Sequence, residues 1–260
     1  MANLADVARR FRCLSLLVGS MILGSGPLAA ADAPFVLYPS FRVETDIFEG
    51  DAASPQSQHL ILFDSGVVYD LPVGNGSIIT VFDIPRNRVI LVHRTTRVRT
   101  SISSDLLIQM TAQVRAEAAV NGKAMDSLGL NAKVISGVTP ESYVVEFDGN
   151  RYEASTQSVS DPAIAAEFAA FTAWAARLNI ARHVGPPPFA RIALADHLAA
   201  LERMPKQVKL DVRRSFKTRT FRSENLVVER LSDPDRKKIS DVGGMIASFT
   251  EVDFSEFPTD

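Results

Sequence analysis

Residues 41–47 read FRVETDI, and this short stretch decides the fold class of the chain. Its apolar side chains alternate with polar or charged ones, a period of two that is typical of a β-strand with one buried and one solvated face. Phe41, Val43 and Ile47 lie on the face that must be covered. The pattern therefore predicts a strand in a sheet that has one covered face.

Short apolar runs follow this strand, with turn residues such as Gly74-Asn75-Gly76 between them. Because the runs are short, β-branched and bounded by turn signals, they predict an antiparallel meander. The expected strands are residues 59–63, 67–71, 78–84, 89–92 and 98–102. Further along, Tyr143, Val145 and Phe147 lead into Asp148-Gly149-Asn150, which is the best hairpin signal in the chain. Residues 208–212 and 221–230 predict another two-stranded ribbon.

Helix signals interrupt these runs of strands. Ser103-Ser104-Asp105 offers N-cap side chains, and Asp161-Pro162 and Ser232-Asp233-Pro234 place an N-cap before a helical proline. The expected helices are residues 103–119, 161–178, 189–203 and 232–248. The expected strands follow one another in runs and do not alternate with helices as they do in βαβ units. This order predicts an α+β fold with a mainly antiparallel sheet, and we expect a single domain over residues 32–260.

Residues 1–31 have the layout of a secretory signal peptide. Three arginines precede a short apolar stretch, and Ala29-Ala30-Ala31 provides a small-residue cleavage site. The alternative is a membrane anchor that is retained, because no charged residue interrupts residues 13–31. Glycines and a proline dilute this segment, and its strongly apolar part is shorter than the ~20 residues of a membrane span. We therefore expect cleavage after Ala31 and a periplasmic or extracellular protein with no stable membrane span.

Composition and motifs exclude several classes of function. The chain has 28 Lys+Arg against 30 Asp+Glu, so its formal charge of −2 gives no basic field for nucleic acid. The one cysteine, Cys13, precedes the cleavage site, which leaves no thiol for disulfides or catalysis. The four histidines have no metal-ligand spacing, and no phosphate loop or nucleophile elbow is present. The sequence indicates no metal and no cofactor.

Two charged patterns could still carry function. Glu44 and Asp46 share a strand face, as paired-carboxylate chemistry requires, but arginines on residues 86–99 are expected as cross-strand partners. Residues 206–222 hold seven cations and one acid, which favours an anionic component of the cell envelope as a partner. The competing interpretation is that these cations form ion pairs with the acidic residues of segment 251–260 of the same chain.

The order of these elements resembles the half-barrel of bacterial periplasmic lipoprotein carriers (LolA/LolB-like), and residues 79–102 are similar to the ribbons of that superfamily. The resemblance covers residues 41–157 and implies a curved antiparallel sheet that is covered by helices over an apolar cavity. The chain departs from the carriers in having no helix before its first strand and a long additional C-terminal part.

The apolar strand faces and the resemblance together give the candidate site. We expect helix 161–178 to cover both faces, with a hydrophobic small molecule or lipid held between sheet and helix. The predicted binding residues are Phe41, Val43, Ile47, Tyr143, Val145 and Phe147. The first hypothesis is an exported, non-catalytic binding protein. The alternatives are an exported hydrolase with a dispersed site and an envelope interaction protein that uses residues 206–222.

Export makes the first testable prediction. The intact mass of protein recovered from the envelope fraction of its own cells should match a chain that starts at Asp32, within about one or two residues, because signal peptidases cut after small residues. Full-length protein held in the inner membrane would contradict it.

Overall fold

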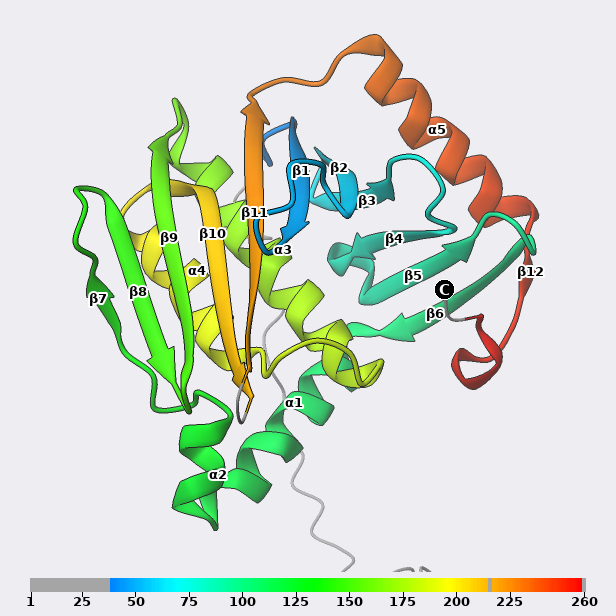
Figure 1. Ribbon diagram of the computed structural model, residues 1–260. Coiled ribbons are helices and arrows are strands. Elements are labelled where there is room, and N and C mark those ends of the chain that lie inside the picture. The colour runs from blue at the N-terminus through cyan, green and yellow to red at the C-terminus, as the bar shows by residue number, and fades with distance from the viewer. Residues whose placement is uncertain (1–37, 215–216, 259–260) are drawn as a thin grey trace, which may run out of the picture. The chain divides into compact units, whose positions relative to one another are not determined.

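The computed structural model describes residues 38–214 and 217–258, which belong to one compact unit. The described residues form a 12-stranded, mostly antiparallel sheet and five α-helices (Figure 1). The sheet is curved and open, and it does not close into a barrel. The predicted α+β class is therefore confirmed. The predicted signal peptide, residues 1–31, lies outside the described residues.

The sheet consists of two antiparallel meanders. The first contains β1 (Phe41–Glu49), β2 (Ser57–Asp64), β3 (Val67–Pro72), β4 (Ile78–Asp83), β5 (Arg88–His93) and β6 (Val98–Ser103). The second contains β7 (Val134–Ser136), β8 (Ser142–Phe147), β9 (Asn150–Ser158), β10 (Arg203–Arg214) and β11 (Lys217–Val228). The first strand of one meander, β1, pairs with the last strand of the other, β11. The short β12 (Thr250–Glu251) adds to β6 in parallel.

The helices are α1 (Ser104–Ala119), α2 (Gly122–Ser127), α3 (Pro162–Ala181), α4 (Phe189–Ala200) and α5 (Asp233–Ser248). Three of them, α1, α3 and α5, begin where the capping residues predict, and the short α2 was not expected from the sequence. Ser103 and Asp161 each accept a hydrogen bond from the backbone two residues on, and Ser232 forms a reciprocal capping box with Asp235. Among the described residues, no helix is both long and apolar enough to cross a membrane.

Helices pack on both faces of the sheet. α3 covers the face that carries Phe41 and Val43, and α4 covers the neighbouring part of the second meander (Figure 1). α5 packs on the opposite face, where Val242 joins the side chains of β3, β4 and β5. The expectation that one helix covers both apolar strands is therefore wrong. The chain returns through Pro186–Pro188 and lays a second helix beside the first, so each meander has its own cover.

A buried polar cluster ties the two meanders together. Thr45 of β1 faces Asn225 of β11, and the Thr45 hydroxyl donates to Asn225 Oδ1 at 2.9 Å. Asn225 Nδ2 donates in turn to the carbonyl of Pro205 at 3.0 Å, where the β9–β10 ladder is irregular. Both partners are largely buried, so the removal of Asn225 would take away the protein hydrogen bond of each.

We expect Asn225→Ala to lower the free energy of unfolding by about 2–4 kcal/mol, because it leaves two buried polar groups without partners. The control is Asn131→Ala, which removes an exposed hydrogen bond to Asp126 and should change stability by no more than about 0.5 kcal/mol. Urea denaturation measures both. Equal midpoints for the two variants would show that Asn225 does not hold the junction.

Candidate functional site

A cavity of about 270 Å³ lies between the centre of the sheet and α3, and we call it the central cavity. Its walls come from β1, β2, β3 and β11 on the sheet side and from α3 and α4 on the other. The lining residues are Thr45, Ile47, His59, Ile61, Asp70, Phe168, Phe171, Thr172, Ala175, Ala176, Asn179, Arg191, Ser223 and Asn225.

Side-chain size along α3 explains why a cavity remains. Phe168 and Phe171 pack into the core beside Phe63, with ring centroids 6.3 and 5.8 Å from it. These rings hold the helix away from the sheet. One turn further along, Ala175 and Ala176 face the sheet with a single methyl group each, too short to fill the same gap. The alternation of large and small residues on one helix face therefore leaves space over β1 and β2.

The sheet wall of the cavity carries a histidine–carboxylate pair. His59 Nδ1 lies 2.7 Å from Asp70 Oδ1, across the β2–β3 ladder. The hydrogen bond to Asp70 raises the pKa of His59, burial opposes the rise, and the charge of Asp70 adds to it. Protonated His59 therefore persists above the ordinary imidazole pKa of about 6.5.

The helix wall carries a cation that the described residues do not neutralise. Arg191 of α4 lines the cavity, and its Nη1 is fully buried without a hydrogen-bond partner. Arg191 forms no hydrogen bond or ion pair within residues 38–214 and 217–258. Tyr152 is its electrostatic neighbour, but burial raises the pKa of Tyr152 to about 12, so this phenol stays neutral. A guanidinium remains charged in proteins, so the cavity has an uncompensated positive charge on one wall.

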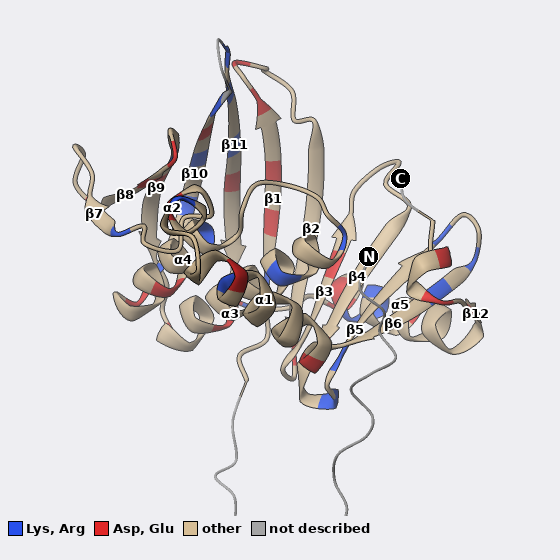
Figure 2. Cartoon of the chain, turned by 90° about the horizontal axis from the view of Figure 1, so that it is seen from below, with Lys and Arg blue, Asp and Glu red and all other residues tan. Residues whose placement is uncertain are grey.

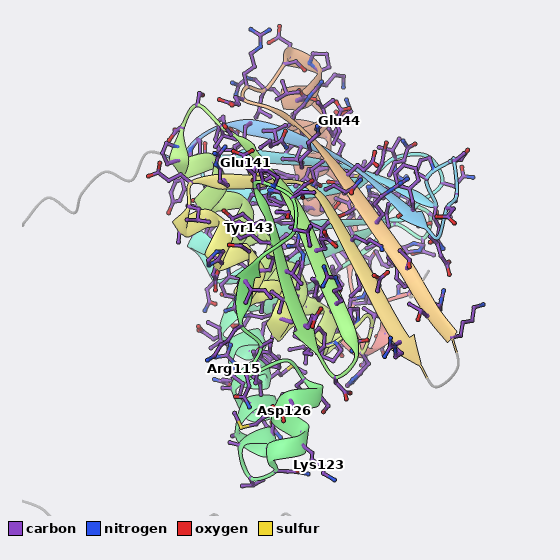
Figure 3. All side chains as sticks on the ribbon, turned by 60° about the vertical axis from the view of Figure 1, so that its left-hand side comes forward. Glu44, Arg115, Lys123, Asp126, Glu141 and Tyr143 are labelled. Carbon is purple, nitrogen blue, oxygen red and sulfur yellow. The ribbon has the colours of Figure 1, made fainter. Side chains whose placement is uncertain are left out.

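The predicted binding residues separate into two groups. Ile47 lines the central cavity, and Phe41 and Val43 are fully buried beside it under α3. Tyr143, Val145 and Phe147 belong instead to the cluster under α4. Figure 3 shows Tyr143 on β8 and Glu44 on β1, and three strands separate β8 from β1 in the sheet. The structure therefore does not bring the six residues into one site.

The polar residues of the cavity were missed from the sequence, although one signal was present. Arg191 lies three, four and seven positions before Leu194, Ala195 and Leu198, which are buried on one face of α4. A charged residue on an apolar helix stripe is unusual and marks a position worth attention. His59 and Asp70 had a weaker signal: both fall on strands that the sequence predicts to be neighbours, residues 59–63 and 67–71, although the two were not predicted to pair.

A second hollow, of about 230 Å³, lies nearer the N-terminal end of α3 and shares Phe171 with the central cavity. Tyr38, Trp174 and Glu167 are among its lining residues. Burial raises the pKa of Glu167, so its carboxyl takes up a proton more readily than an exposed one. The hollow has no arginine, histidine or lysine in its lining, which distinguishes it from the central cavity.

The charged patterns singled out in the sequence have partners other than the expected ones. Glu44 pairs with Arg42 at 2.9 Å, and Asp46 accepts a hydrogen bond from Gln58. The arginines of residues 86–99 were expected here, but three strands separate β5 from β1. That expectation is therefore wrong.

The cations of residues 206–222 also pair locally. The ion pairs are Lys209–Asp211, Arg219–Glu49 and Arg222–Glu224. Figure 2 shows the resulting mixture of acidic and basic segments along β1, β10 and β11. The acidic C-terminal residue Glu251 pairs with Arg99 instead of the ribbon. The basic segment is thus partly neutralised, by carboxylates of β1, β10 and β11, and none of these ion pairs joins it to the described C-terminal residues 251–258.

Within the described residues, no group of three or more His, Asp or Glu side chains is placed to hold a metal ion. Comparison of the chain with protein-family models and with curated proteins finds no match. The geometry of the cavity is therefore the basis for the functional argument.

The His59–Asp70 pair gives a pH-dependent prediction. In Asp70→Asn, the pKa of His59 should fall below about 6.5, because burial then acts without the carboxylate. In the unmutated protein the raised pKa stabilises the fold fully below pH about 6.5, and this contribution is lost as the pH rises through the folded-state pKa. NMR titration of the imidazole signals measures the shift, and the other histidine signals should be the same in both proteins. An unchanged His59 titration in Asp70→Asn would contradict the pairing.

Proposed function

We propose that this chain is a non-catalytic binding protein whose central cavity holds a small amphipathic molecule. The observation that carries the proposal is the composition of the cavity walls. Ile47, Ile61, Phe168 and Phe171 offer an apolar lining, and a few polar groups converge on the same space. Ligand sites combine these two features, with the apolar walls supplying affinity and the polar groups supplying orientation.

The central cavity has a volume of about 270 Å³ and opens to solvent. A six-carbon chain with one polar group is therefore a suitable probe for it, and a longer chain would extend through the opening. The proposed ligand places its apolar part against the apolar walls and its polar group beside the polar side chains of the cavity.

We also propose that the protein is exported, on the basis of residues 1–31. A binding protein outside the cytoplasm would meet its ligand in the periplasm or the medium. The basic residues 206–222 are less suited to an anionic envelope partner, because three of their cations already have carboxylates within 3.2 Å.

The second candidate function is hydrolysis, and the His59–Asp70 hydrogen bond favours it. An oriented histidine in a cavity can act as a general base. The nearby hydroxyl groups have other partners: Thr45 donates to Asn225 Oδ1, and Ser223 donates to the Val208 carbonyl. A nucleophile activated by His59 would instead have to be water, and binding without chemistry is the better supported function.

Filling the cavity tests the proposal. Binding of hexan-1-ol to the unmutated protein should shift the methyl NMR signals of Ile47 and Ile61, which line the cavity. In Ala175→Phe these shifts should disappear, because the phenyl ring fills the space that the alcohol would occupy. Ala166→Phe is the matched control, since Ala166 lies on the exposed side of α3 and outside both hollows. Filling a cavity should cost less than the about 1–3 kcal/mol of overpacking a solid core.

No shift in the unmutated protein at the solubility limit of hexan-1-ol would refute the binding function. Turnover of short-chain esters that is lost in both Ala175→Phe and Asp70→Asn, but kept in Ala166→Phe, would establish hydrolysis in its place.

A further inference from the structure

We propose that the ligand of the central cavity is a monoanion, a short apolar molecule with one carboxylate that Arg191 binds. The inference rests on the proposed function and names the chemical class of its ligand. It is carried by Arg191, a cation that lines the cavity and forms no hydrogen bond or ion pair with the described residues.

Burial of an unpaired charge is costly, and buried polar atoms nearly always have partners. Arg191 cannot escape this cost by losing its proton, and its neutral neighbour Tyr152 cannot balance the charge. The described residues contain no carboxylate that pairs with Arg191. Nη1 itself is closed off from the cavity, so an anion there would pair with the remaining guanidinium nitrogens, whose planar fork matches a carboxylate with two parallel hydrogen bonds.

The charges around the cavity favour a single negative charge over two. The charged groups that line it are His59 and Asp70 on the sheet and Arg191 on α4, and the lining residues of α3 are all uncharged. With His59 protonated, His59 and Asp70 balance each other through their hydrogen bond, and Arg191 leaves one net positive charge. A monoanion neutralises it, whereas a dianion would leave an excess negative charge facing Asp70.

The apolar walls fix the orientation of this ligand. Arg191 enters from α4, whereas Ile47 and Ile61 lie on the sheet side. A carboxylate at Arg191 therefore places the alkyl chain over β1 and β2, where Ala175 and Ala176 leave room. The ligand lies across the cavity with its polar end toward α4 and its apolar end toward the sheet.

Three six-carbon probes test the charge, and the unmutated full chain is titrated with each by NMR. Hexanoate should bind about ten- to a hundredfold more tightly than hexan-1-ol, as expected for a charge-assisted hydrogen bond, and hexylammonium should bind more weakly than the alcohol. Arg191→Met, which keeps an unbranched side chain without charge, should remove the preference for hexanoate over hexan-1-ol. Arg182→Met is the control, because Arg182 caps α3 outside the cavity lining.

Arg191→Lys keeps the charge but not the fork, and it should retain part of the preference; this variant also serves if Arg191→Met does not fold. If hexan-1-ol and hexanoate bind equally, and Arg191→Met changes neither, the ligand is not an anion but the binding function stands. If neither probe binds the unmutated protein, both the inference and the proposed function are wrong.

Discussion

The pairing of β1 with β11 is the contact on which the rest of the structure depends. Each meander alone has an edge strand with unpaired backbone groups, and β1 and β11 satisfy each other along eight residue pairs. Thr45 and Asn225 then place a hydrogen-bonded pair inside this junction, where a mismatched register would leave both groups without partners. The joined strands form one continuous sheet, so the helices that return from β9 have a common face to cover.

The central cavity is a consequence of this junction. Ile47 and Thr45 come from one side of it, Ser223 and Asn225 from the other, and the cavity lies across the boundary. Arg191 reaches it because the chain between β9 and β10 forms two helices, of which the second runs beside the first. No short segment of the chain contains the site, so a change of register at β1–β11 would dismantle it without altering any of its residues.

Local features of the fold were predictable because local chemistry determines them. Asp161 and Ser232 cap helices that begin at the expected prolines, and Asp148-Gly149 turns the expected hairpin, with both residues at positive φ. The β1–β11 pairing was not predictable, since any strand with one apolar face could have joined β1, and the partners Thr45 and Asn225 are 180 positions apart. The candidate site followed the same division. Ile47 was found from its alternation, whereas Arg191 of α4 reaches His59 and Asp70 of the β2–β3 hairpin only through long-range packing.

The rigidity of the aromatic cluster gives the cavity its fixed size. Phe41 stacks on Phe63 at 4.0 Å, and the edge of Phe171 meets both Phe63 and Phe82, so α3 cannot move toward the sheet without breaking these ring contacts. Collapse over Ala175 and Ala176 would close the cavity, but it would also drive the Arg191 guanidinium further from water. Packing and electrostatics therefore oppose collapse together. The same two constraints underlie the proposed ligand, because the phenylalanines keep the space between α3 and the sheet open and Arg191 supplies the positive charge on its wall.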